Sequence, residues 1–232
     1  MIKVILWDLD QTLLDFKRSE FCALEKAFEH FCLGKLSREL HLSYSKINEE
    51  CWRMLERCEL TKPQVMEQRF KRFFAKENIK CPASPSEFSD YYESRLPDTV
   101  AFVDNAVEVL TCLKSRVKQY VVTNGASAVQ HKRLEKSGLD LLLDGVFISD
   151  EIGYEKPSAR FFEPVLNEAL KFAERDEILI IGDSLTSDIK GGNNAKIKTC
   201  LFSPNGCDAD VGYKIDYRIC DIIEVVDNYE LW

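Results

Sequence analysis

The stretch that most constrains the fold of this chain is an apolar run near its start that ends at two acids. Val, Ile, Leu and Trp dominate residues 2–7, and Asp8 and Asp10 follow with one residue between them. A short run of this kind is typical of a parallel strand that is buried on both faces. Ligands bind where such strands end in open α/β sheets. The pattern therefore predicts a buried first strand whose end carries both acids.

The spacing of the two acids is compatible with a catalytic or cation-binding site. Alternate residues of an extended chain point the same way, so Asp8 and Asp10 can aim at one point if the strand geometry persists past Trp7. Such a pair suits a cation, or a nucleophile beside an acid/base. A lone Asp-x-Asp is more often a turn or a helix cap, so other stretches must decide between these readings.

Length and charge exclude several classes of protein. The chain has 232 residues, enough for a sizeable core, and a formal net charge of −8. This charge argues against a nucleic-acid polymer or an anionic membrane as partner, although a small anionic ligand needs only local positive charge. We see neither a signal peptide, nor an apolar run long enough to span a bilayer, nor a lipidation signal at Tyr229 to Trp232. We expect a cytoplasmic protein.

The cysteines and histidines show no metal-binding spacing. The nine cysteines lie at positions 22, 32, 51, 58, 81, 112, 200, 207 and 220. They include no Cys-x-x-Cys pair, and His30, His41 and His131 are scattered. We expect buried free thiols in a reducing compartment.

Apolar periodicity divides the chain into two regions. From about Lys17 to Leu96 apolar residues recur at helical intervals, with Pro63 and Pro85 in the first turns of two expected helices. Beyond Asp98, helices and short apolar runs alternate, which is typical of βαβ units and a parallel sheet. The expected strands are 119–123, 145–149, 177–181 and 199–202, and the expected helices are 106–114, 127–136, 159–172, 186–194 and 222–229. We predict an α/β core of residues 1–14 and 97–232, interrupted by an all-helical insertion of residues 15–96.

Polar residues of complementary chemistry follow four of the predicted strands. They are Asp8 and Asp10, then Thr123 and Asn124, then Lys156, then Asp183 with Asp188 beyond it. Parallel strands place all these ends at one edge of the sheet. Each element alone is ordinarily a turn, a surface lysine or a helix cap, but their joint occurrence in this order is hard to obtain by chance.

The set matches the requirements of phosphoryl transfer. Asp8 can attack phosphorus to form an aspartyl-phosphate, and Asp10 can protonate the leaving oxygen and then take a proton from water. Thr123 and Asn124 would donate hydrogen bonds to phosphoryl oxygens, and Lys156 would contribute positive charge. We therefore count these five residues as catalytic candidates, and the last three also as substrate-binding candidates.

A divalent cation is required, because three acids around one anion would repel it. Hard oxygen ligands from Asp8, Asp183 and a backbone carbonyl, which we assign to Asp10, suit Mg²⁺. Asp188 either binds the metal directly or orients a ligating water.

At these residues the chain resembles the haloacid-dehalogenase superfamily of phosphohydrolases. The resemblance covers nearly the whole chain and implies a Rossmann-like three-layer core with a helical cap domain of residues 15–96. It implies that Asp8 is the nucleophile, Asp10 the acid/base and Asp183 a Mg²⁺ ligand. The acid at Asp10 favours phosphatases over true dehalogenases.

A narrower resemblance concerns three stretches of the chain. Residues 15–16, 57–74 and 181–195 resemble pyrimidine 5′-nucleotidases of the YjjG type. Gln11 stands where that group usually has an acid, and Lys196 where a glycine usually follows the helix. The lysine costs roughly 1 kcal/mol if a left-handed conformation is required.

We therefore expect a Mg²⁺-dependent phosphomonoester hydrolase that acts through an aspartyl-phosphate, favouring a pyrimidine nucleoside monophosphate as small-molecule substrate. Two alternatives remain open. One has the same chemistry and is a phosphatase for a sugar phosphate or phosphoglycolate; the other is of a different class and is a phosphate-responsive binding or signalling module without turnover. A catalytically silent partner-binding relative is disfavoured by the intact set of catalytic residue types.

Overall fold

The computed structural model describes residues 1–206 and 212–232, which form two compact units. Met1–Asp15 and Ala101–Trp232 make up an α/β unit, and Phe16–Val100 make up a helical unit. The chain leaves the α/β unit after its first strand and returns to it only after the whole helical unit has been built.

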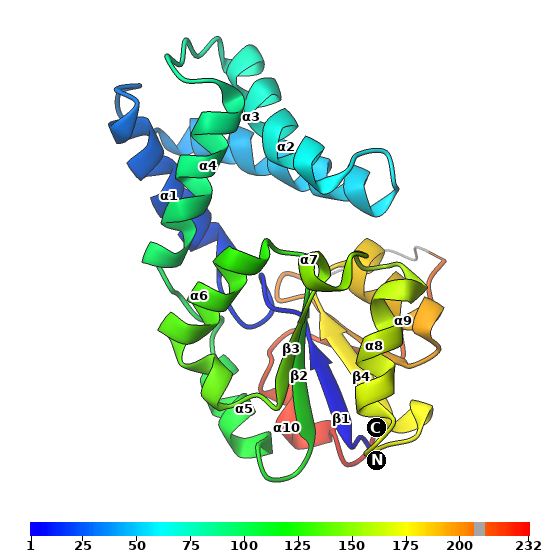
Figure 1. The fold of residues 1–232 in the computed structure, drawn as a ribbon. Helices are drawn as coiled ribbons and strands as arrows, with labels where there is room; N and C mark the ends of the chain where they lie inside the picture. The colour runs from blue at the N-terminus through cyan, green and yellow to red at the C-terminus, as the bar shows by residue number, and fades with distance from the viewer. Residues whose placement is uncertain (207–211) are drawn as a thin grey trace. The chain divides into compact units, whose positions relative to one another are not determined.

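The α/β unit is built on a six-stranded parallel sheet with the strand order β3-β2-β1-β4-β5-β6. The strands are β1 (Val4–Trp7), β2 (Lys118–Thr123), β3 (Gly145–Ile148), β4 (Ile178–Gly182), β5 (Lys198–Phe202) and β6 (Tyr217–Ile219). The first strand thus lies inside the sheet, between β2 and β4 (Figure 1). All four residues of β1 are buried, as its apolar sequence predicts.

Helices cover both faces of this sheet (Figure 1). The α-helices of this unit are α5 (Ala106–Leu113), α6 (Ser127–Ser137), α7 (Ser149–Ile152), a single turn directly after β3, α8 (Ala159–Ala169), α9 (Lys190–Ala195) and α10 (Glu224–Asn228). Val4 and Leu6 of β1 share an apolar cluster with α8 on one face. Trp7 alternates to the other face, where its indole donates to Gln119 at 3.2 Å, and Gln119 donates to the Leu110 carbonyl of α5 at 2.9 Å. The predicted three-layer fold is confirmed.

Most predicted elements of the α/β unit are observed within a few residues, with three differences. The predicted helix over 186–194 divides into a π-helical turn, Leu185–Ile189, and α9. Strand β6 was missed because it has only three residues and a single buried position. Helix α7 was missed because it is a single turn. Lys196 does adopt the left-handed conformation, with φ 57°.

The helical unit contains four helices: α1 (Phe16–His30), α2 (Arg38–Glu56), α3 (Lys62–Glu77) and α4 (Pro85–Arg95). Local sequence explains where α4 begins. The Ser84 hydroxyl accepts from the Glu87 N–H at 3.2 Å, and the Glu87 carboxylate accepts from the Ser84 N–H at 2.8 Å. Proline occupies the first turn of both α3 and α4, as predicted.

Aromatic side chains fill the interior of the helical unit. Phe28, Phe70, Phe73 and Phe88 are at most 2% exposed, and Phe70 stacks on Tyr44 with ring centroids 4.9 Å apart. The helical spacing predicted for this region therefore places apolar side chains in the core, although Phe21 in α1 and Phe31 directly after it are only half-buried.

An arginine is buried among these rings. Arg69 is 1% exposed and donates to Ser89 at 3.1 Å and to the Glu93 carboxylate at 2.5 Å. Its guanidinium carbon also lies 5.1 Å from the Phe70 ring centre and 5.0 Å from that of Tyr92. A charge held in this way joins α3 to α4.

The cysteines were only partly predicted. The eight cysteines in the described residues are free thiols, while Cys207 lies outside them. Only Cys51 and Cys200 are buried, and four others are exposed, so the expectation of buried thiols was wrong for those four. In the same described part of the chain, no helix combines the length and the apolar character needed to cross a membrane.

Replacing Arg69 by alanine should lower the free energy of unfolding by about 3 to 5 kcal/mol, because Glu93 would lose its buried partner. Urea denaturation measures this loss. Arg53→Ala is the matched control in the same unit, since Arg53 is 57% exposed and lies 3.9 Å from Glu49. Its cost should stay below about 1 kcal/mol. Equal costs for the two variants would contradict a stabilising role for the buried pair.

Candidate active site

The carboxyl ends of the central strands bring the predicted site residues to one edge of the sheet. Trp7 lies beside Val121 of β2 and Ile181 of β4. The Asp8 N–H donates to the Ile181 carbonyl at 2.9 Å, so the strand geometry continues one residue past β1. Asp8 is consequently held by the ladder itself and is only 8% exposed.

Lys156 is the buried centre of the site. Its side chain is 1% exposed, and its ammonium group donates to Asp8 Oδ1, to Asp188 Oδ1 and to the Val122 carbonyl, each at 2.7 Å. Burial alone would lower the pKa of Lys156, but the carboxylates of Asp188 and Asp8 raise it above its ordinary value. The lysine therefore remains charged and uses its three donors on three oxygens.

Asn124 holds the backbone of that lysine. Its side-chain Oδ1 accepts from the Lys156 N–H at 2.8 Å, and its Nδ2 donates to the Lys156 carbonyl at 2.9 Å. These paired hydrogen bonds join the end of β2 to the loop that follows α7. They give Asn124 a contact that was not foreseen from the sequence, where it was considered only as a donor to phosphate.

The surroundings of Asp8 change the pKa of its carboxyl group. Burial raises the pKa of Asp8 to about 7, and the charges of Asp188 and Asp10 add to the rise, while Lys156 opposes it. A divalent cation beside this carboxylate would favour its ionised form.

Three carboxylates gather around the lysine. Asp8, Asp183 and Asp188 each offer an oxygen, and these oxygens all lie within 4.8 Å of one another. Asp183 is exposed, yet the protein atoms around it and the charges of Asp8 and Asp188 raise its pKa. Two buried acids and one exposed acid thus share a single lysine cation.

Glycine allows this close approach at the end of β4. A Cβ at position 182 would overlap the Asp188 carboxylate. That carboxylate also accepts the Ser184 N–H at 3.1 Å through Oδ2. Gly182 and Ser184 therefore fix Asp188 next to Asp183.

The acid cluster fits a divalent cation. Lys156 offsets one of the three negative charges, and hard carboxylate oxygens are the ligands that Mg²⁺ prefers. The exposed Asp183 leaves the cluster open on one side. Two predictions about the metal stay predictions: that Asp188 binds it directly or orients a ligating water, and that the Asp10 backbone carbonyl is a ligand.

Asp10 and Thr123 are joined through helix α6. Gln130 donates from Nε2 to Asp10 Oδ2 at 2.8 Å and to Thr123 Oγ1 at 2.9 Å. Arg133 forms an ion pair with Asp10 Oδ1. Thr123 Oγ1 also accepts the Gly125 N–H at 3.1 Å.

Gln130 and Arg133 were missed from the sequence. Both are 1% exposed, on a helix whose buried apolar residues are Val129 and Leu134. Helical spacing places Arg133 on the face of Val129, and Gln130 on the face of Leu134. Polar residues within the apolar stripe of a helix that follows a site loop are the signal that could have found them.

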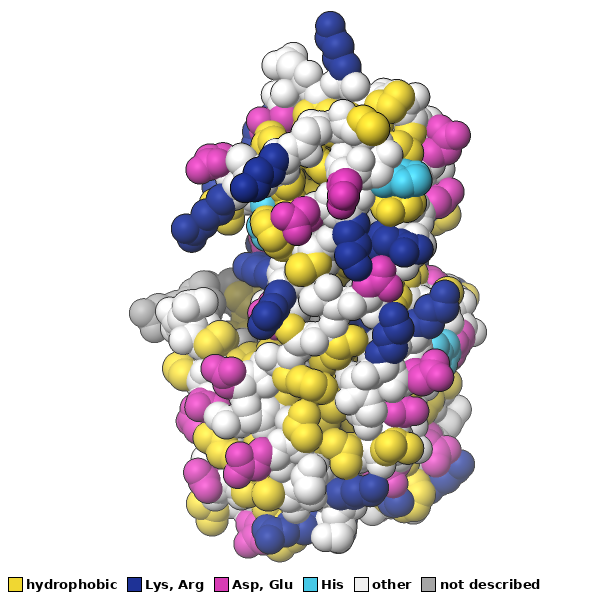
Figure 2. Space-filling model, turned by 90° about the vertical axis from the view of Figure 1, so that its left-hand side faces the viewer, with side chains coloured by type: hydrophobic (Ala, Val, Ile, Leu, Met, Phe, Trp, Pro, Cys, Tyr) yellow, Lys and Arg dark blue, Asp and Glu magenta, His cyan; other side chains and the backbone are white. Residues whose placement is uncertain are grey.

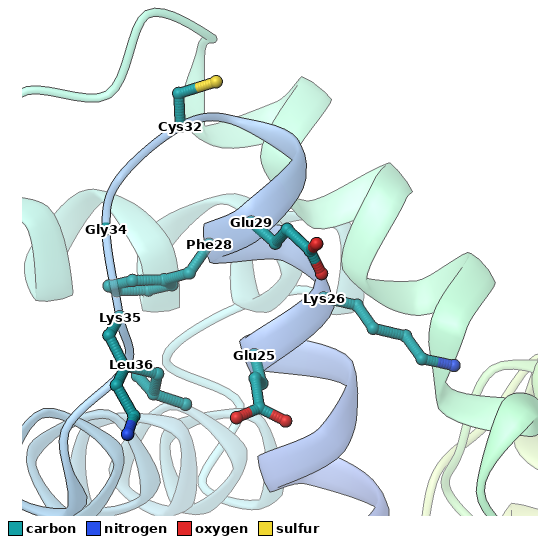
Figure 3. A pocket seen from close by; sticks show the side chains of 8 residues that line it. All are labelled: Glu25, Lys26, Phe28, Glu29, Cys32, Gly34, Lys35 and Leu36. Atoms are coloured by element: carbon teal, nitrogen blue, oxygen red, sulfur yellow. The ribbon is translucent and has the colours of Figure 1, made fainter.

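Two further features stand out on the surface of the described residues. A depression of about 610 Å³ lies wholly within the helical unit and is lined by residues of both charges, among them Glu25, Glu29 and Lys35 (Figure 3). Figure 2 shows apolar side chains gathered in a band on one face of the α/β unit, with charged side chains on either side. The depression includes none of the site residues predicted from the sequence.

Comparison with protein families gives one match over most of the chain. The model described as "Haloacid dehalogenase-like hydrolase" matches residues 5–202, which include all the residues of the acid cluster, Lys156 and helix α6.

Individual proteins match along nearly their full length. The pyrimidine 5′-nucleotidase PynA of Streptococcus pneumoniae is 32% identical, over 97% of this chain and 95% of that protein. The pyrimidine 5′-nucleotidase YjjG of Escherichia coli is 29% identical, over 95% of both. Among solved structures, the putative HAD-hydrolase YfnB of Bacillus subtilis, bound to magnesium, superimposes with a TM-score of 0.90 at 31% identity and covers 97% of both chains.

Mg²⁺ should raise the thermal unfolding temperature, because it neutralises repulsion that exists only in the folded state. At a free concentration about 100 times its Kd, the gain should be about 2.7 kcal/mol, or roughly 5 to 10 °C. Differential scanning fluorimetry with Mg²⁺ and with chelator measures the shift.

Asp183→Asn should abolish most of this shift without lowering the unfolding temperature in chelator, since it removes one repelling charge. Asp140→Asn, at an exposed acid of the same unit, is the matched control and should keep the full shift. An unchanged shift in Asp183→Asn would place the cation elsewhere.

Proposed function

Because this chain belongs to the haloacid dehalogenase-like hydrolase family, as its motifs predicted, and is therefore an enzyme, we propose that it is a Mg²⁺-dependent phosphomonoesterase. The observation that carries the proposal is Lys156, which holds a buried carboxylate at the strand end next to two further acids. Such an arrangement suits an anionic substrate that is attacked by a carboxylate.

Asp8 is the proposed nucleophile. A carboxylate oxygen of Asp8 attacks phosphorus, the bond from phosphorus to the leaving oxygen breaks, and an aspartyl-phosphate remains. The backbone of Asp8 is fixed by β4, and its Oδ1 is fixed by Lys156, so the attacking group needs little reorganisation.

Asp10 is the proposed acid/base. It donates its proton to the leaving oxygen in the first step and, as a carboxylate, accepts a proton from the water that attacks the aspartyl-phosphate in the second. The products are the alcohol, inorganic phosphate and the free Asp8 carboxylate. The side chain of Asp10 is 29% exposed, which leaves it accessible to a leaving group.

Lys156, Thr123 and Asn124 complete the proposed site. Lys156 supplies fixed positive charge beside the attacking carboxylate, and Thr123 lies at the end of β2 with a hydroxyl for a phosphoryl oxygen. Asn124 contributes by holding Lys156 in place, as its two hydrogen bonds to that backbone suggest.

We assign the cation to Asp8 and Asp183, with Asp188 as a third ligand or as the residue that orients a water. When bound, Mg²⁺ would offset the charge of the carboxylates and of the phosphoryl group. The magnesium in the solved structure of YfnB supports this choice of metal.

The substrate class that we favour is a pyrimidine nucleoside monophosphate. The support is the full-length similarity to PynA and YjjG, both named pyrimidine 5′-nucleotidases. We propose that the helical unit is the cap that selects the leaving group. The solved structure of YfnB, which is described as revealing interdomain movement, is in keeping with such a role.

Base recognition does not fall to the aromatic residues of the stretch 57–74 that resembles this group. Phe70 and Phe73 are fully buried in the helical unit, and Phe74 is 9% exposed. We infer that these rings serve the packing of the helical unit. Residues with exposed side chains must select the substrate within the helical unit.

Phosphate release from a panel of phosphomonoesters, with Mg²⁺ or chelator, tests the proposal. We expect dUMP, UMP and dTMP to lead over purine nucleotides and sugar phosphates, and chelator to abolish the signal. If a sugar phosphate or phosphoglycolate is hydrolysed fastest, the phosphomonoesterase function stands and the proposed substrate class is wrong. Silence with every ester, together with a stable phosphorylated form, would favour the binding or signalling module.

Asp8→Asn should reduce turnover of the best ester by several orders of magnitude, because the uncatalysed reaction is among the slowest known. Steady-state assays measure this loss, and circular dichroism verifies the fold. Asp140→Asn should keep wild-type turnover, as an exposed acid outside the cluster. Turnover retained in Asp8→Asn would exclude Asp8 as the nucleophile.

A further inference from the structure

Helix α6 holds both oxygens of the Asp10 carboxylate. Gln130 Nε2 donates to Oδ2 at 2.8 Å, and the Arg133 guanidinium pairs with Oδ1. Both partners are 1% exposed, whereas the Asp10 side chain is 29% exposed. One side of this carboxylate is thus bound to the helix, and the rest remains open.

The same helix connects Asp10 to the end of β2. Gln130 Nε2 also donates to Thr123 Oγ1 at 2.9 Å, and Gln130 Oε1 accepts from Arg133 Nη1 at 2.9 Å. Thr123, Gln130, Arg133 and Asp10 therefore form one continuous chain of polar contacts. A shift of any member would move the carboxylate relative to the threonine hydroxyl.

The glycine after Asn124 makes room for this chain of contacts. A Cβ at position 125 would overlap the side-chain amide of Gln130. The site loop therefore has no side chain at the point where Gln130 crosses it.

Packing alone does not account for an arginine at position 133. Burying a guanidinium carries a large desolvation cost, and a well-packed apolar residue in its place often leaves a protein as stable or more so. Arg133 is nevertheless 1% exposed, and its described ionic partner is a carboxylate at the edge of the proposed site. The geometry points to a role in the reaction.

We propose that Gln130 and Arg133 are positioning residues that hold Asp10 where it delivers its proton to the leaving oxygen. This inference rests on the proposed phosphomonoesterase function. As the bond from phosphorus to the leaving oxygen breaks, that oxygen takes the proton from Asp10, and the carboxylate that remains is the group that both residues contact. Neither residue touches the substrate in this role.

Leaving groups of different basicity separate positioning from a structural role. An alkyl phosphate such as dUMP needs a proton on its departing alkoxide, whereas 4-nitrophenyl phosphate releases a stable anion. The ratio of kcat/KM for the two esters, measured on one preparation, does not depend on the fraction of active enzyme. It also covers only the steps up to departure of the leaving group.

Gln130→Met and Arg133→Met should each lower kcat/KM for the alkyl ester by about 10²-fold, and for the aryl ester by less than about 3-fold, because general acid catalysis contributes about 10² to 10⁴. Leu134→Ala removes a buried apolar side chain from the same helix and is the matched control. It should change both values by the same factor.

The outcomes separate the inference from the function on which it rests. Equal loss with both esters, or no loss with either, would overturn the positioning role while the phosphomonoesterase function stands. Wild-type enzyme inactive on both esters and on the whole phosphomonoester panel would overturn the function itself. If Arg133→Met does not fold, Gln130→Met decides the question. Gln130 contacts Asp10 and Thr123 through a neutral amide, so its replacement removes no charge from the protein interior.

Discussion

The charge balance around Lys156 is the interaction on which the rest of the site depends. One buried ammonium donates to two carboxylates and a strand carbonyl, while a third carboxylate lies within 4.8 Å of the other two. Without the lysine, Asp8 and Asp188 would be buried acids that repel each other and lack the cation that now pairs with both. With the lysine, two of the three negative charges remain to be offset. We propose that Mg²⁺ supplies the positive charge that offsets them.

Two physical regularities explain how much of this could be predicted. Residues 4–7 are apolar on both faces, so they had to form an inner strand, and parallel connections place every following loop at one edge. Because Asp8, Thr123, Lys156 and Asp183 each follow one of these strands, their positions in the sequence were sufficient to predict that they lie near one another. The cap role of residues 15–96 followed from resemblance alone and stays a proposal.

The unpredicted features of the site depend on contacts between residues distant in sequence. Gln130 and Arg133 lie 120 and 123 residues from Asp10. Their place in the apolar stripe of α6 could indicate that they are buried, but it does not identify Asp10 as their partner. By residue type Asn124 is expected to donate a hydrogen bond to a phosphoryl oxygen, and this stays a prediction. The pairing of its amide with the Lys156 backbone, 32 residues away, could not be predicted from residue type. Local patterns predict elements and their ends, whereas pairing between side chains requires the fold.

The most direct test of the account is chemical identification of the phosphorylated residue during a single turnover. The enzyme is mixed with its best ester and Mg²⁺, stopped with acid within milliseconds, and digested for mass spectrometry. We predict a phosphoryl group on Asp8 that forms before inorganic phosphate is released and decays at least as fast as the enzyme turns over. Full-rate phosphate release with no phosphorylated Asp8, or with the phosphoryl group on another residue, would contradict it.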